Sequence, residues 1–557
     1  MTPLTRRILF LFLVSVSFIF FLSLGAPFPR RFPFPEYNLG LSTLKDITIL
    51  HTNDLHAHYE EINIEGKECT EAERVSKQCL GGVGRLAKTI KQWRKSTPDL
   101  LLLDAGDQFQ GTIFYNIFKG DLVAQVMNEL QYDLMVLGNH EFDDGPEALA
   151  DFIEKVNFPV ICANCVVDQS PRLGALLKPY HVFASHGLGV IGYVKNVTGS
   201  ISNAGPTVSF TDPIYSVQKY VNHLRNNLGI QKVIALSHNG YIDDLYLASK
   251  VRGLDAIVGG HSHTYLSSDR KDQNFKYSKG AYPTIVKDLD GNDIYVVQAW
   301  AWGRYLGHID ISYDQKDRLT KLSGAPRMLE NSIEKDDAME ELISVHSAKI
   351  DQIKSEVVGY ATAAFSHRGC MSHECQIGNL VTDAMLDFQA EDGAEAAIIN
   401  TGAIRGELSS GNITMKDMMV ILPFGDNIVQ VKMTGQEIRD FVESYLSLRS
   451  VYSKENIKGF LQVSGLRITV DKKGPEFKRL QKLEIWNKAQ KRYNLVLNQQ
   501  EYQIVTGNFL AQGGDRIIRP IPNLTPIEDI SNVLVSYIRS HTPLTPFIEG
   551  RIKILKR

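Results

Sequence analysis

Five short apolar runs in the first half of the chain each end in Asp, Asn or His side chains, and this pattern constrains the fold more than any other feature. In the clearest case, the run Leu134 to Leu137 stops at Gly138 and is followed by Asn139, His140 and Asp143. An apolar run that ends at a glycine and then presents polar groups is typical of a buried strand with chemistry at its carboxyl end. Considered alone, this segment could be no more than a polar turn.

The same arrangement recurs at four other places. The runs are Ile47 to Leu50, Leu100 to Leu103, Val233 to Leu236 and Ala256 to Val258, and each leads directly into a polar segment. Helical-looking segments lie between the runs, and in an open α/β sheet the carboxyl ends of the strands all face one crevice. Six side chains with oxygen or imidazole ligand atoms would therefore meet there, namely Asp54, His56, Asp107, Asn139, His238 and His261.

These six side chains have the chemistry of a site for two divalent cations. A mixture of imidazole, carboxylate and amide ligands favours zinc, manganese or iron over calcium. We expect two divalent metal ions, zinc first, with manganese, magnesium and calcium as the alternatives. His140 and Asp143 follow the third run as a possible acid/base pair. Coincidental polar strand ends are the alternative explanation, and the recurrence at every run argues against it.

The composition indicates a globular protein with more than one domain. The chain has 557 residues and a formal net charge of −3, with 43% hydrophobic and 22% charged residues. This length is enough for two domains, and the composition is ordinary for soluble folds. The charge balance indicates neither a basic patch nor an acidic tail, so we expect no nucleic-acid partner.

Residues 1–25 are predicted to be a signal peptide, because Arg6 and Arg7 precede an apolar run from Ile8 to Leu24 and small residues follow. An uncleaved membrane anchor is the alternative, since the run is slightly long. The basic segment 548–557 lacks the hydrophobic tail that a glycolipid anchor signal requires. We therefore expect a secreted, extracellular protein without a membrane anchor.

The cysteines agree with secretion. Six cysteines fall into three local pairs, Cys69 with Cys79, Cys162 with Cys165 and Cys370 with Cys375. An even number after a signal peptide favours disulfides, although the sequence does not prove the connectivity. The pair at 162 and 165 could instead be a redox or metal motif. Acceptor sequences for N-linked glycosylation begin at Asn196, Asn412 and Asn523.

Alternating strand-like and helix-like segments predict a first, layered α/β domain over residues 43–329. The charged segment 331–353 has apolar residues at helical spacing and is predicted to be a helix that joins two domains. A second α/β domain is expected over residues 357–557. Further expectations are helices at 83–94, 120–130 and 376–388, and a surface loop over 60–78.

A second group of motifs lies in the second domain. The strand-like run 396–399 ends in a glycine turn that carries Asn400 and Arg405. Phe424 and Phe509 each lie near a glycine and an aspartate, which for Phe509 is Asp515. Two aromatic rings can enclose a planar base, and a carboxylate can accept hydrogen bonds from hydroxyl groups. The alternative is that both phenylalanines belong to the core, the usual place for Phe.

Taken together, these motifs resemble the 5'-nucleotidase/apyrase family of metallophosphatases along nearly the whole mature chain. The resemblance rests on seven motifs in family order, HTNDLH at 51–56, GDQFQG at 106–111, GNHE at 138–141, GGHSH at 259–263, NTGAIR at 400–405, LPFG at 422–425 and NFLAQGGD at 508–515. It implies a metallophosphatase domain followed by a nucleotide-binding domain.

The resemblance also implies roles for the residues of the first domain. Asp107 would bridge two metal ions. The other implied ligands are Asp54, His56, Asn139, His238 and His261. His140, oriented by Asp143, is similar to the family's catalytic dyad, which stabilises or protonates as the phosphate ester breaks.

In the second domain, the resemblance implies a binding site for the nucleotide. Arg405 and Asn400 are similar to phosphate and ribose contacts of the family. Phe424 and Phe509 would clamp the base, and Asp515 would hold the ribose. The family closes its site by rotating the second domain, which fits the expected joining helix.

Three positions depart from the pattern of the vertebrate ecto-5'-nucleotidases. His58 replaces a usual arginine, and His263 replaces a usual asparagine, although other family members have histidine there. Met371 replaces an arginine that binds phosphate, and Arg368 is the candidate substitute. The length of the phosphate chain in the substrate is therefore open.

The ligand set predicts hydrolysis of a phosphate ester by water that two cations activate. We expect a secreted apyrase that cleaves ATP and ADP and stops at AMP, because no anchor is expected and position 371 is methionine. The chain then resembles the soluble apyrases of blood-feeding arthropod saliva, which implies inhibition of platelet aggregation. The first alternative is a 5'-nucleotidase that cleaves AMP to adenosine. The alternative of another class is a non-enzymatic secreted binder of nucleotides or platelet receptors.

Overall fold

The computed structural model describes residues 45–521 and 524–555. The expected signal peptide at 1–25 and the glycosylation site Asn523 lie outside the described residues. The side chains of the other two acceptors, Asn196 and Asn412, are exposed. None of the helices in the described ranges is long and apolar enough to span a membrane.

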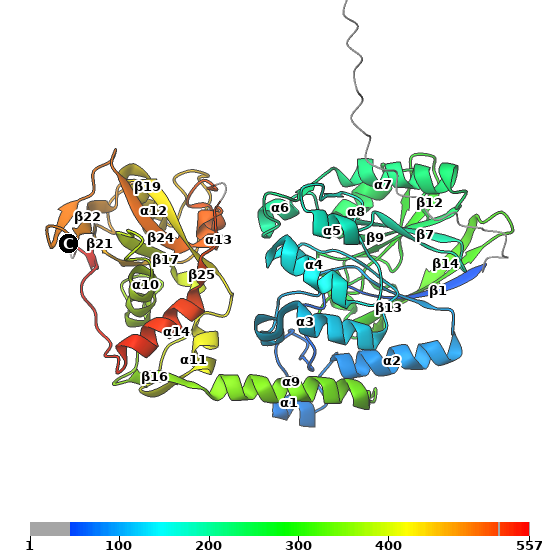
Figure 1. The fold of residues 1–557 in the computed structure, drawn as a ribbon, viewed down its shortest axis with the longest axis horizontal. Helices are drawn as coiled ribbons and strands as arrows, with labels where there is room; N and C mark the ends of the chain where they lie inside the picture. The colour runs from blue at the N-terminus through cyan, green and yellow to red at the C-terminus, as the bar shows by residue number, and fades with distance from the viewer. Residues whose placement is uncertain (1–44, 522–523, 556–557) are drawn as a thin grey trace, which may run out of the picture. The chain divides into compact units, whose positions relative to one another are not determined.

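The first domain contains two large sheets (Figure 1). One sheet has the order β14-β13-β1-β2-β3-β4, with β15 paired to β13. Its parallel strands are β1 (Asp46–Thr52), β2 (Leu101–Asp104), β3 (Leu134–Val136) and β4 (Val160–Ile161). Antiparallel β13 (Tyr305–Tyr313), β14 (Leu319–Gly324) and β15 (Arg327–Met328) complete it.

The second sheet has the order β11-β12-β10-β9-β7-β6. Its central strands β12 (Asp293–Val297), β10 (Ala256–Gly259), β9 (Lys232–His238) and β7 (Leu188–Val194) are parallel. The edge strands β11 (Thr284–Lys287) and β6 (Tyr180–Phe183) are antiparallel to their neighbours. The five polar-ended runs therefore do not share one open sheet as expected, because β1, β2 and β3 lie in the first sheet and β9 and β10 in the second.

The two sheets pack face to face. Strand β3 contacts β7 and β9, and β4 contacts β7, where a Cβ at Gly192 would lie only 2.6 Å from the side chain of Ile161 in β4. All residues of β2, β7 and β9 are buried, which identifies strands covered on both faces. The outer layers are helices, so the domain has four layers and the strand ends of both sheets can meet.

The helices of the outer layers lie on opposite sides of the domain (Figure 1). Helices α2 (Val83–Ser96), α3 (Ile113–Leu130) and α4 (Gly145–Lys155) cover the first sheet, and α7 (Pro213–Asn222) and α8 (Tyr241–Ala248) cover the second. Helix α3 starts earlier than expected, with a break at Lys119, where φ is 51°. The expected loop over 60–78 contains the short helix α1 (Glu71–Val75), which Thr70 and Glu73 stabilise by a capping box.

Short elements fill the connections of the first domain. They are α5 (Pro171–Leu176), α6 (Thr198–Ile201), the strand pair β5 (Cys165–Val166) and β8 (Ser209–Phe210), the 3-10 turns η1 (His140–Phe142) and η3 (Phe275–Tyr277), and the π turn η2 (His223–Asn227).

Helix α9 (Asp337–Ser355) follows the first domain. It begins later than the expected 331–353, because the side chain of Asp336 accepts a hydrogen bond from the backbone N–H of Met339 and so caps the helix there. Its apolar stripe, with Met339 and Ile343, is buried in the core that α2 and α3 form.

The second domain is built around a five-stranded sheet of order β20-β17-β24-β19-β25. These strands are β20 (Leu461–Ser464), β17 (Ala396–Asn400), β24 (Glu501–Gly507), β19 (Asn427–Thr434) and β25 (Glu528–Asp529). Ala397 and Ile399 pack on one face against α10 (Gln376–Phe388), α11 (Met415–Ile421) and α14 (Ile530–His541). Ile398 packs on the other face against α12 (Gly435–Ser447).

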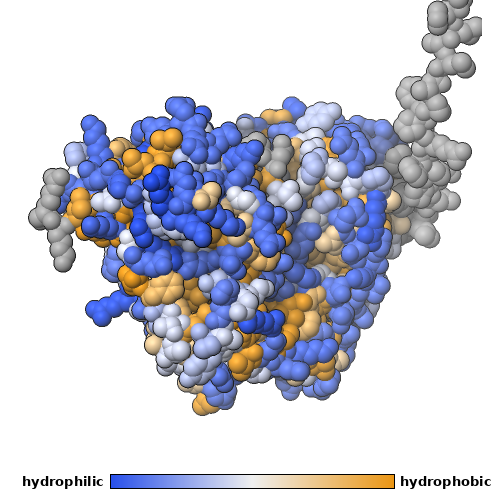
Figure 2. All heavy atoms as spheres, turned by 60° about the vertical axis from the view of Figure 1, so that its left-hand side comes forward, coloured by the Kyte–Doolittle hydropathy of each residue, from blue (hydrophilic) through white to orange (hydrophobic). Residues whose placement is uncertain are grey.

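Two smaller sheets complete this domain, one with β16 (Val357–Ala361) and β18 (Gly411–Thr414), the other with the order β23-β22-β21-β26. The latter consists of β23 (Arg492–Leu495), β22 (Leu480–Asn487), β21 (Leu466–Val470) and β26 (Ile552–Ile554). Short turns are η4 (Thr401–Ala403), α13 (Asn508–Ala511) and η5 (Gly514–Arg516). Figure 2, in which this domain comes forward, shows a largely hydrophilic surface with apolar side chains exposed in places.

All six cysteines form disulfides, and the bonds join the expected local pairs. They are Cys69–Cys79, Cys162–Cys165 and Cys370–Cys375. The pair at 162 and 165 is therefore a disulfide, and not a metal motif.

Candidate functional site

The polar strand ends of the first domain have an unusual backbone conformation. Positive φ angles occur at Asp54 (52°), His56 (49°), Asp107 (57°), His261 (72°) and His263 (48°). This left-handed region costs a non-glycine residue on the order of 1–3 kcal/mol, and such residues cluster at functional sites. The turns that follow β1, β2 and β10 are therefore candidates for chemistry on backbone grounds as well.

Asp107 holds two neighbours through its two carboxylate oxygens. Oδ1 accepts a hydrogen bond from the backbone N–H of His140 at 2.9 Å, and Oδ2 lies 2.9 Å from Nε2 of His238. The ring of His238 is oriented by its Nδ1, which donates to the carbonyl oxygen of Ala105 at 2.7 Å. Burial acts to lower the pKa of His238, but the carboxylates of Asp107 and Asp54 outweigh it and raise the pKa to about 10. The surroundings of Asp107 therefore favour a positive charge.

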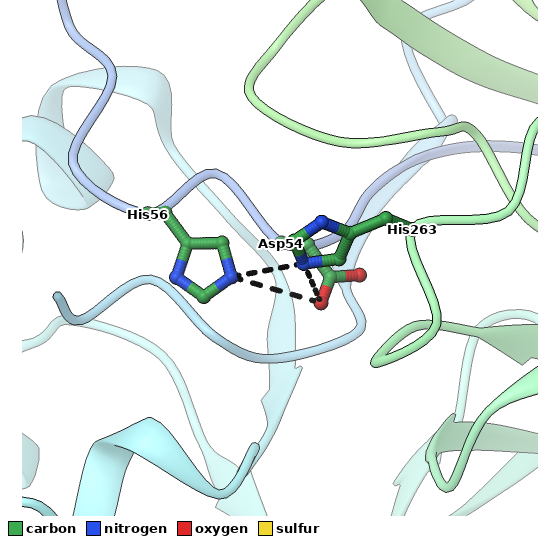
Figure 3. A group of neighbouring side chains, drawn as sticks. All are labelled: Asp54, His56 and His263. Carbon is green, nitrogen blue, oxygen red and sulfur yellow. Dashed lines mark hydrogen bonds and ion pairs between the residues drawn. The ribbon is translucent and has the colours of Figure 1, made fainter. Parts of the chain in front are cut away.

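Asp54, His56 and His263 form a second group of ligand-type side chains (Figure 3). Nε2 of His263 lies 3.3 Å from Oδ1 of Asp54 and 3.1 Å from Nε2 of His56. Nδ1 of His56 donates to the carbonyl oxygen of Phe109 at 3.0 Å, which leaves its Nε2 lone pair directed at the group. Two imidazole nitrogens and a carboxylate oxygen thus converge on one point.

The two groups fit two adjacent divalent cations. Within each group the ligand atoms lie within 4.8 Å of one another, in Asp54, His56 and His263 and in Asp107, His238 and His261. The groups adjoin, because Nε2 of His56 lies 3.8 Å from Oδ2 of Asp107. Oδ1 of Asn139 is buried without a hydrogen-bond partner among the described residues, and a buried oxygen of this kind is costly unless a ligand satisfies it.

The structure thus brings together five of the six side chains that the sequence pattern selected as ligands, namely Asp54, His56, Asp107, His238 and His261, and it adds His263. Asn139 lies on the turn after β3, next to His140, whose backbone N–H donates to Asp107. Sequence reasoning noted His263 only as a departure from a pattern. The available signal was its spacing two residues after His261, on the same turn.

Glu141 holds the turns of the site together and was also missed as a functional residue. Its Oε1 accepts from the backbone N–H groups of Gln108 and Phe109, at 2.8 and 3.1 Å. Its Oε2 accepts from those of Asp107 and Gly138, at 3.0 and 2.6 Å. The side chain is fully buried. One carboxylate therefore links the turn after β2 to the turn after β3.

His140 and Asp143 form the expected pair. Nδ1 of His140 donates to Oδ2 of Asp143 at 2.6 Å, and Oγ of Ser202 donates to Oδ1 of the same carboxylate at 2.7 Å. Burial acts to lower the pKa of His140, but Asp143 and the charge of Asp107 outweigh it and raise the pKa to about 9. Asp143 therefore orients the imidazole of His140 through Nδ1. The centroid of this ring lies 5.3 Å from that of His56.

In the second domain, Asn400 and Asp515 lie together. Nδ2 of Asn400 donates to Oδ2 of Asp515 at 3.1 Å, and the hydroxyl of Tyr445 donates to the same oxygen at 2.8 Å. Tyr445 is buried, and Asp515 has a positive φ of 53°. Both donors use Oδ2, so Oδ1 of Asp515 keeps its capacity to accept from a ligand hydroxyl. Tyr445 was not selected by sequence reasoning.

Phe424 and Phe509 are not core residues. Their exposed fractions are 63% and 51%, which is incompatible with the core alternative. Asp426 joins the two loops, because its Oδ1 accepts from the backbone N–H of Phe509 at 3.1 Å. The guanidinium of Arg405, which is exposed, lies 5.8 Å from the centroid of the Phe424 ring.

Of the positions that depart from the family pattern, His58 contacts an aromatic ring and Met371 contacts a hydroxyl group. The ring of His58 stacks on Trp302 at 5.3 Å between centroids. The side chain of Met371 is 52% exposed, and its Sδ accepts from Oγ1 of Thr401 at 3.1 Å. Arg368, which precedes the Cys370–Cys375 disulfide, is exposed.

Comparison with known proteins agrees with this geometry. Residues 47–265 match the family described as calcineurin-like phosphoesterase, and residues 354–520 match the 5'-nucleotidase C-terminal domain. The fold and the paired ligand groups thus define a metallophosphoesterase of the calcineurin type, followed by a nucleotidase C-terminal domain.

Relatives over the full length narrow the assignment. The 5'-nucleotidase of Bos taurus is 35% identical over 91% of this chain and 91% of its own length, and the snake venom 5'-nucleotidase of Naja atra is 34% identical over 91% and 98%. The solved structure of a 5'-nucleotidase precursor from Thermus thermophilus is 33% identical, with a TM-score of 0.61, and covers 92% of this chain and 100% of its own. The chain belongs to the 5'-nucleotidase family.

It is therefore a metal-dependent nucleotide phosphohydrolase, which leaves the non-enzymatic binder without support. The relatives favour the 5'-nucleotidase alternative over the apyrase interpretation.

Proposed function

We propose that this chain is a 5'-nucleotidase that releases phosphate from nucleoside 5'-monophosphates such as AMP. The observation that carries the proposal is the similarity to 5'-nucleotidases through both domains, over 91% of the chain. The convergence of imidazole and carboxylate ligands in the first domain supports the hydrolytic part of this function.

The proposed reaction centre consists of two cation sites. Asp54, His56 and His263 would hold one ion, and Asp107, Asn139, His238 and His261 the other, with Asp107 close enough to His56 to serve both. When bound, two divalent ions lower the pKa of water and neutralise charge on the phosphate. We propose zinc as the native metal, because imidazole side chains are the most numerous of these ligands.

His140 is the proposed proton-transfer group of the site. Asp143 orients its ring through Nδ1, so that Nε2 is the nitrogen available to the phosphate ester. A proton held at this nitrogen can be donated to the leaving oxygen, or the imidazolium can stabilise negative charge as the ester breaks.

The second domain is proposed to bind the nucleoside. Oδ1 of Asp515 can accept from a ribose hydroxyl, and Asn400 holds the carboxylate in place. The exposed rings of Phe424 and Phe509 are proposed to enclose the base, and Arg405 to contact phosphate.

A second candidate is the apyrase activity on ATP and ADP. The observation that favours it is Met371, an exposed thioether where the family resemblance implies an arginine next to the phosphate. A charge-assisted contact contributes on the order of 1.5–3 kcal/mol, so the loss of this contact would weaken the binding of AMP by roughly tenfold or more. Nucleoside di- and triphosphates present additional oxygens to Arg405 and would tolerate the change better.

The two candidates differ in their products. Purified protein with zinc or manganese would be incubated separately with ATP, ADP and AMP, and nucleotides, adenosine and phosphate would be quantified over time. A 5'-nucleotidase converts AMP to adenosine, whereas an apyrase accumulates AMP from ATP and ADP. Accumulation of AMP without adenosine would overturn the 5'-nucleotidase proposal.

The contribution of position 371 is tested by Met371→Arg, with Met371→Leu as the matched control. We expect the arginine variant to lower the KM for AMP by about tenfold and the leucine variant to leave it unchanged. Equal KM values in all three proteins would remove position 371 from phosphate binding.

We also propose that the protein works outside the cell. Three disulfides are typical of secreted proteins, and relatives that are named as venom enzymes act outside the cell that makes them. Asn196 and Asn412 are exposed and would carry glycans. Glycosidase treatment should increase the electrophoretic mobility of the secreted protein, and this measurement tests the extracellular proposal. Inhibition of platelet aggregation tests the apyrase candidate.

A further inference from the structure

A cluster of two tryptophans and one arginine lies beside the ligand group of Asp54, His56 and His263. The members of this Trp–Arg cluster are Trp300, Trp302 and Arg304. The guanidinium carbon of Arg304 lies 4.4 Å from the ring of Trp300 and 4.5 Å from the ring of Trp302. Both tryptophans have a φ of 62°, in the region that bulky residues rarely adopt. The surrounding structure must therefore hold both in place.

Arg304 is held by aromatic faces and not by an ion pair. The residue is only 3% exposed, and within the described ranges its side chain has no carboxylate partner. Nε is buried without a hydrogen-bond partner among the same residues, and burial lowers the pKa of the guanidinium to about 10. A buried cation is costly, and contact with two indole faces offsets part of that cost.

Trp302 connects the cluster to the ligand group by three contacts. Its backbone N–H donates to the carbonyl oxygen of Asp54 at 2.8 Å. The edge of its ring meets the ring of His263, with 5.7 Å between centroids and 80° between planes. It also stacks on His58, at 5.3 Å and 24°. Two of these neighbours, Asp54 and His263, supply ligand-type atoms 3.3 Å apart.

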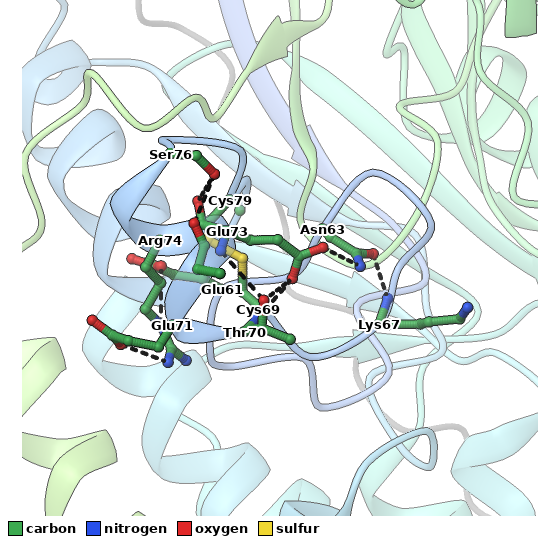
Figure 4. Close-up of a disulfide and its surroundings, with 12 residues drawn as sticks. Glu61, Asn63, Lys67, Cys69, Thr70, Glu71, Glu73, Arg74, Ser76 and Cys79 are labelled. Carbon is green, nitrogen blue, oxygen red and sulfur yellow. Dashed lines mark hydrogen bonds and ion pairs between the residues drawn. A yellow bond between two sulfur atoms is a disulfide. The ribbon is translucent and has the colours of Figure 1, made fainter.

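On its other flank, Trp302 lies against Gly66, in the turn from Asn63 to Lys67 that precedes the Cys69–Cys79 disulfide; Figure 4 shows Asn63, Lys67 and this disulfide. A Cβ at Gly66 would lie 1.9 Å from a ring carbon of Trp302 and 2.6 Å from Nη2 of Arg304. A hydrogen bond closes this turn, because Oδ1 of Asn63 accepts from the backbone N–H of Lys67 at 3.1 Å. The turn at Gly66 therefore packs directly against the cluster.

We propose that the Trp–Arg cluster is a positioning device for the metal centre, in which Trp302 sets the ring of His263 and the backbone of Asp54. This inference rests on the proposed function, because it assumes that the two ligand groups bind ions. Arg304 and Gly66 act through Trp302, and none of these residues is itself a ligand. Replacing residues that orient metal ligands typically weakens metal binding by about 10–100-fold.

The direct test is Gly66→Ala, because the added methyl group would overlap the ring of Trp302 and displace it. The matched control is Gly291→Ala, because Gly291 has a similar φ of 85°, against 83° at Gly66, but open space around its Cβ. Both variants carry the backbone strain of a side chain at positive φ, and only one displaces the indole. Metal-free protein would be titrated with Co²⁺, and the visible absorption bands and the bound stoichiometry recorded.

We expect wild type and Gly291→Ala to bind two ions. Gly66→Ala should hold one ion at least tenfold more weakly and the second with unchanged affinity. Arg304→Lys is the second variant, since an ammonium lacks the planar face that packs on both indoles, and it should weaken the same ion.

The outcomes separate the two levels of the inference. A wild-type chain that takes up no ion would overturn the metal centre and the positioning role with it. Two ions held equally by wild type, Gly66→Ala and Arg304→Lys would overturn the positioning role alone. A loss of thermal stability in these variants without a change in metal affinity would mark the cluster as structural only.

Discussion

At the scale of single residues, a metal ligand and a proton-transfer group depend on different contacts, although both belong to the same turns. Asp107 contributes through its side-chain oxygens, which face His238 and the backbone of His140. His140 contributes its backbone N–H to Asp107 and its imidazole to Asp143. Substitutions at these two positions should therefore have separable effects.

Replacement of His140 by alanine should leave metal binding intact and slow hydrolysis by about 10²–10⁴-fold. The reason is that alanine keeps the backbone N–H that donates to Asp107 and removes only the imidazole. Steady-state turnover and metal content would be measured together. Asp107→Ala is the control and should lose bound ions as well as activity. Loss of metal from His140→Ala would contradict its assignment as a proton-transfer group.

Replacement of Tyr445 by phenylalanine should raise the KM for AMP by roughly 2–10-fold with little change in kcat. The variant removes the hydroxyl that donates to Oδ2 of Asp515, while the ring remains in the core. Metal content should not change, because the two ligand groups lie in the first domain. The KM and kcat for AMP decide the point, and a fall in kcat alone would contradict a role in nucleoside binding.

At the scale of elements, the site depends on how the turn after β2 and η1 are joined. Glu141, in η1, accepts from four backbone N–H groups with its two oxygens. The amide of glutamine has only one acceptor oxygen, and its NH₂ group would face two of these donors. The position of Asp107 therefore depends on a fully buried side chain.

Glu141→Gln should accordingly lower the free energy of unfolding by about 1–3 kcal/mol and weaken metal binding. Denaturant unfolding and metal titration measure the two effects. Glu71→Gln is the control, since the carboxylate of Glu71 is 81% exposed and a surface ion pair contributes little. Unchanged metal affinity in Glu141→Gln would show that the turn holds Asp107 without this carboxylate.

At the scale of the whole molecule, metal binding should couple activity to stability. Each ion that binds only the folded chain adds roughly 2.7 kcal/mol to the free energy of unfolding at a hundred times its Kd. Chelation should therefore abolish phosphate release and lower the unfolding temperature, and added zinc or manganese should restore both. Full activity after exhaustive chelation, with no ion found by elemental analysis, would contradict the metal centre.

Local sequence was sufficient to predict much of the molecule. Apolar runs that end in ligand-type residues identified five strands, and five of the six side chains chosen from them converge in the structure. Helix α10 has the predicted bounds, and the disulfides join the predicted pairs. These predictions succeeded because burial periodicity, turn residues and the spacing of cysteines are properties of short segments.

Tertiary structure alone decided which of these segments meet. Whether β1 and β10 share a sheet depends on pairing between strands about two hundred residues apart, and they lie in different sheets. His263 joins Asp54 and His56 only because β10 ends opposite the turn after β1. Trp302 and Tyr445 have no local signal, since their roles arise from contacts with distant residues. The sequence by itself determined the chemistry available to this protein, and long-range packing determined its geometry, because contacts between distant segments form only when both sheets and their helices are assembled.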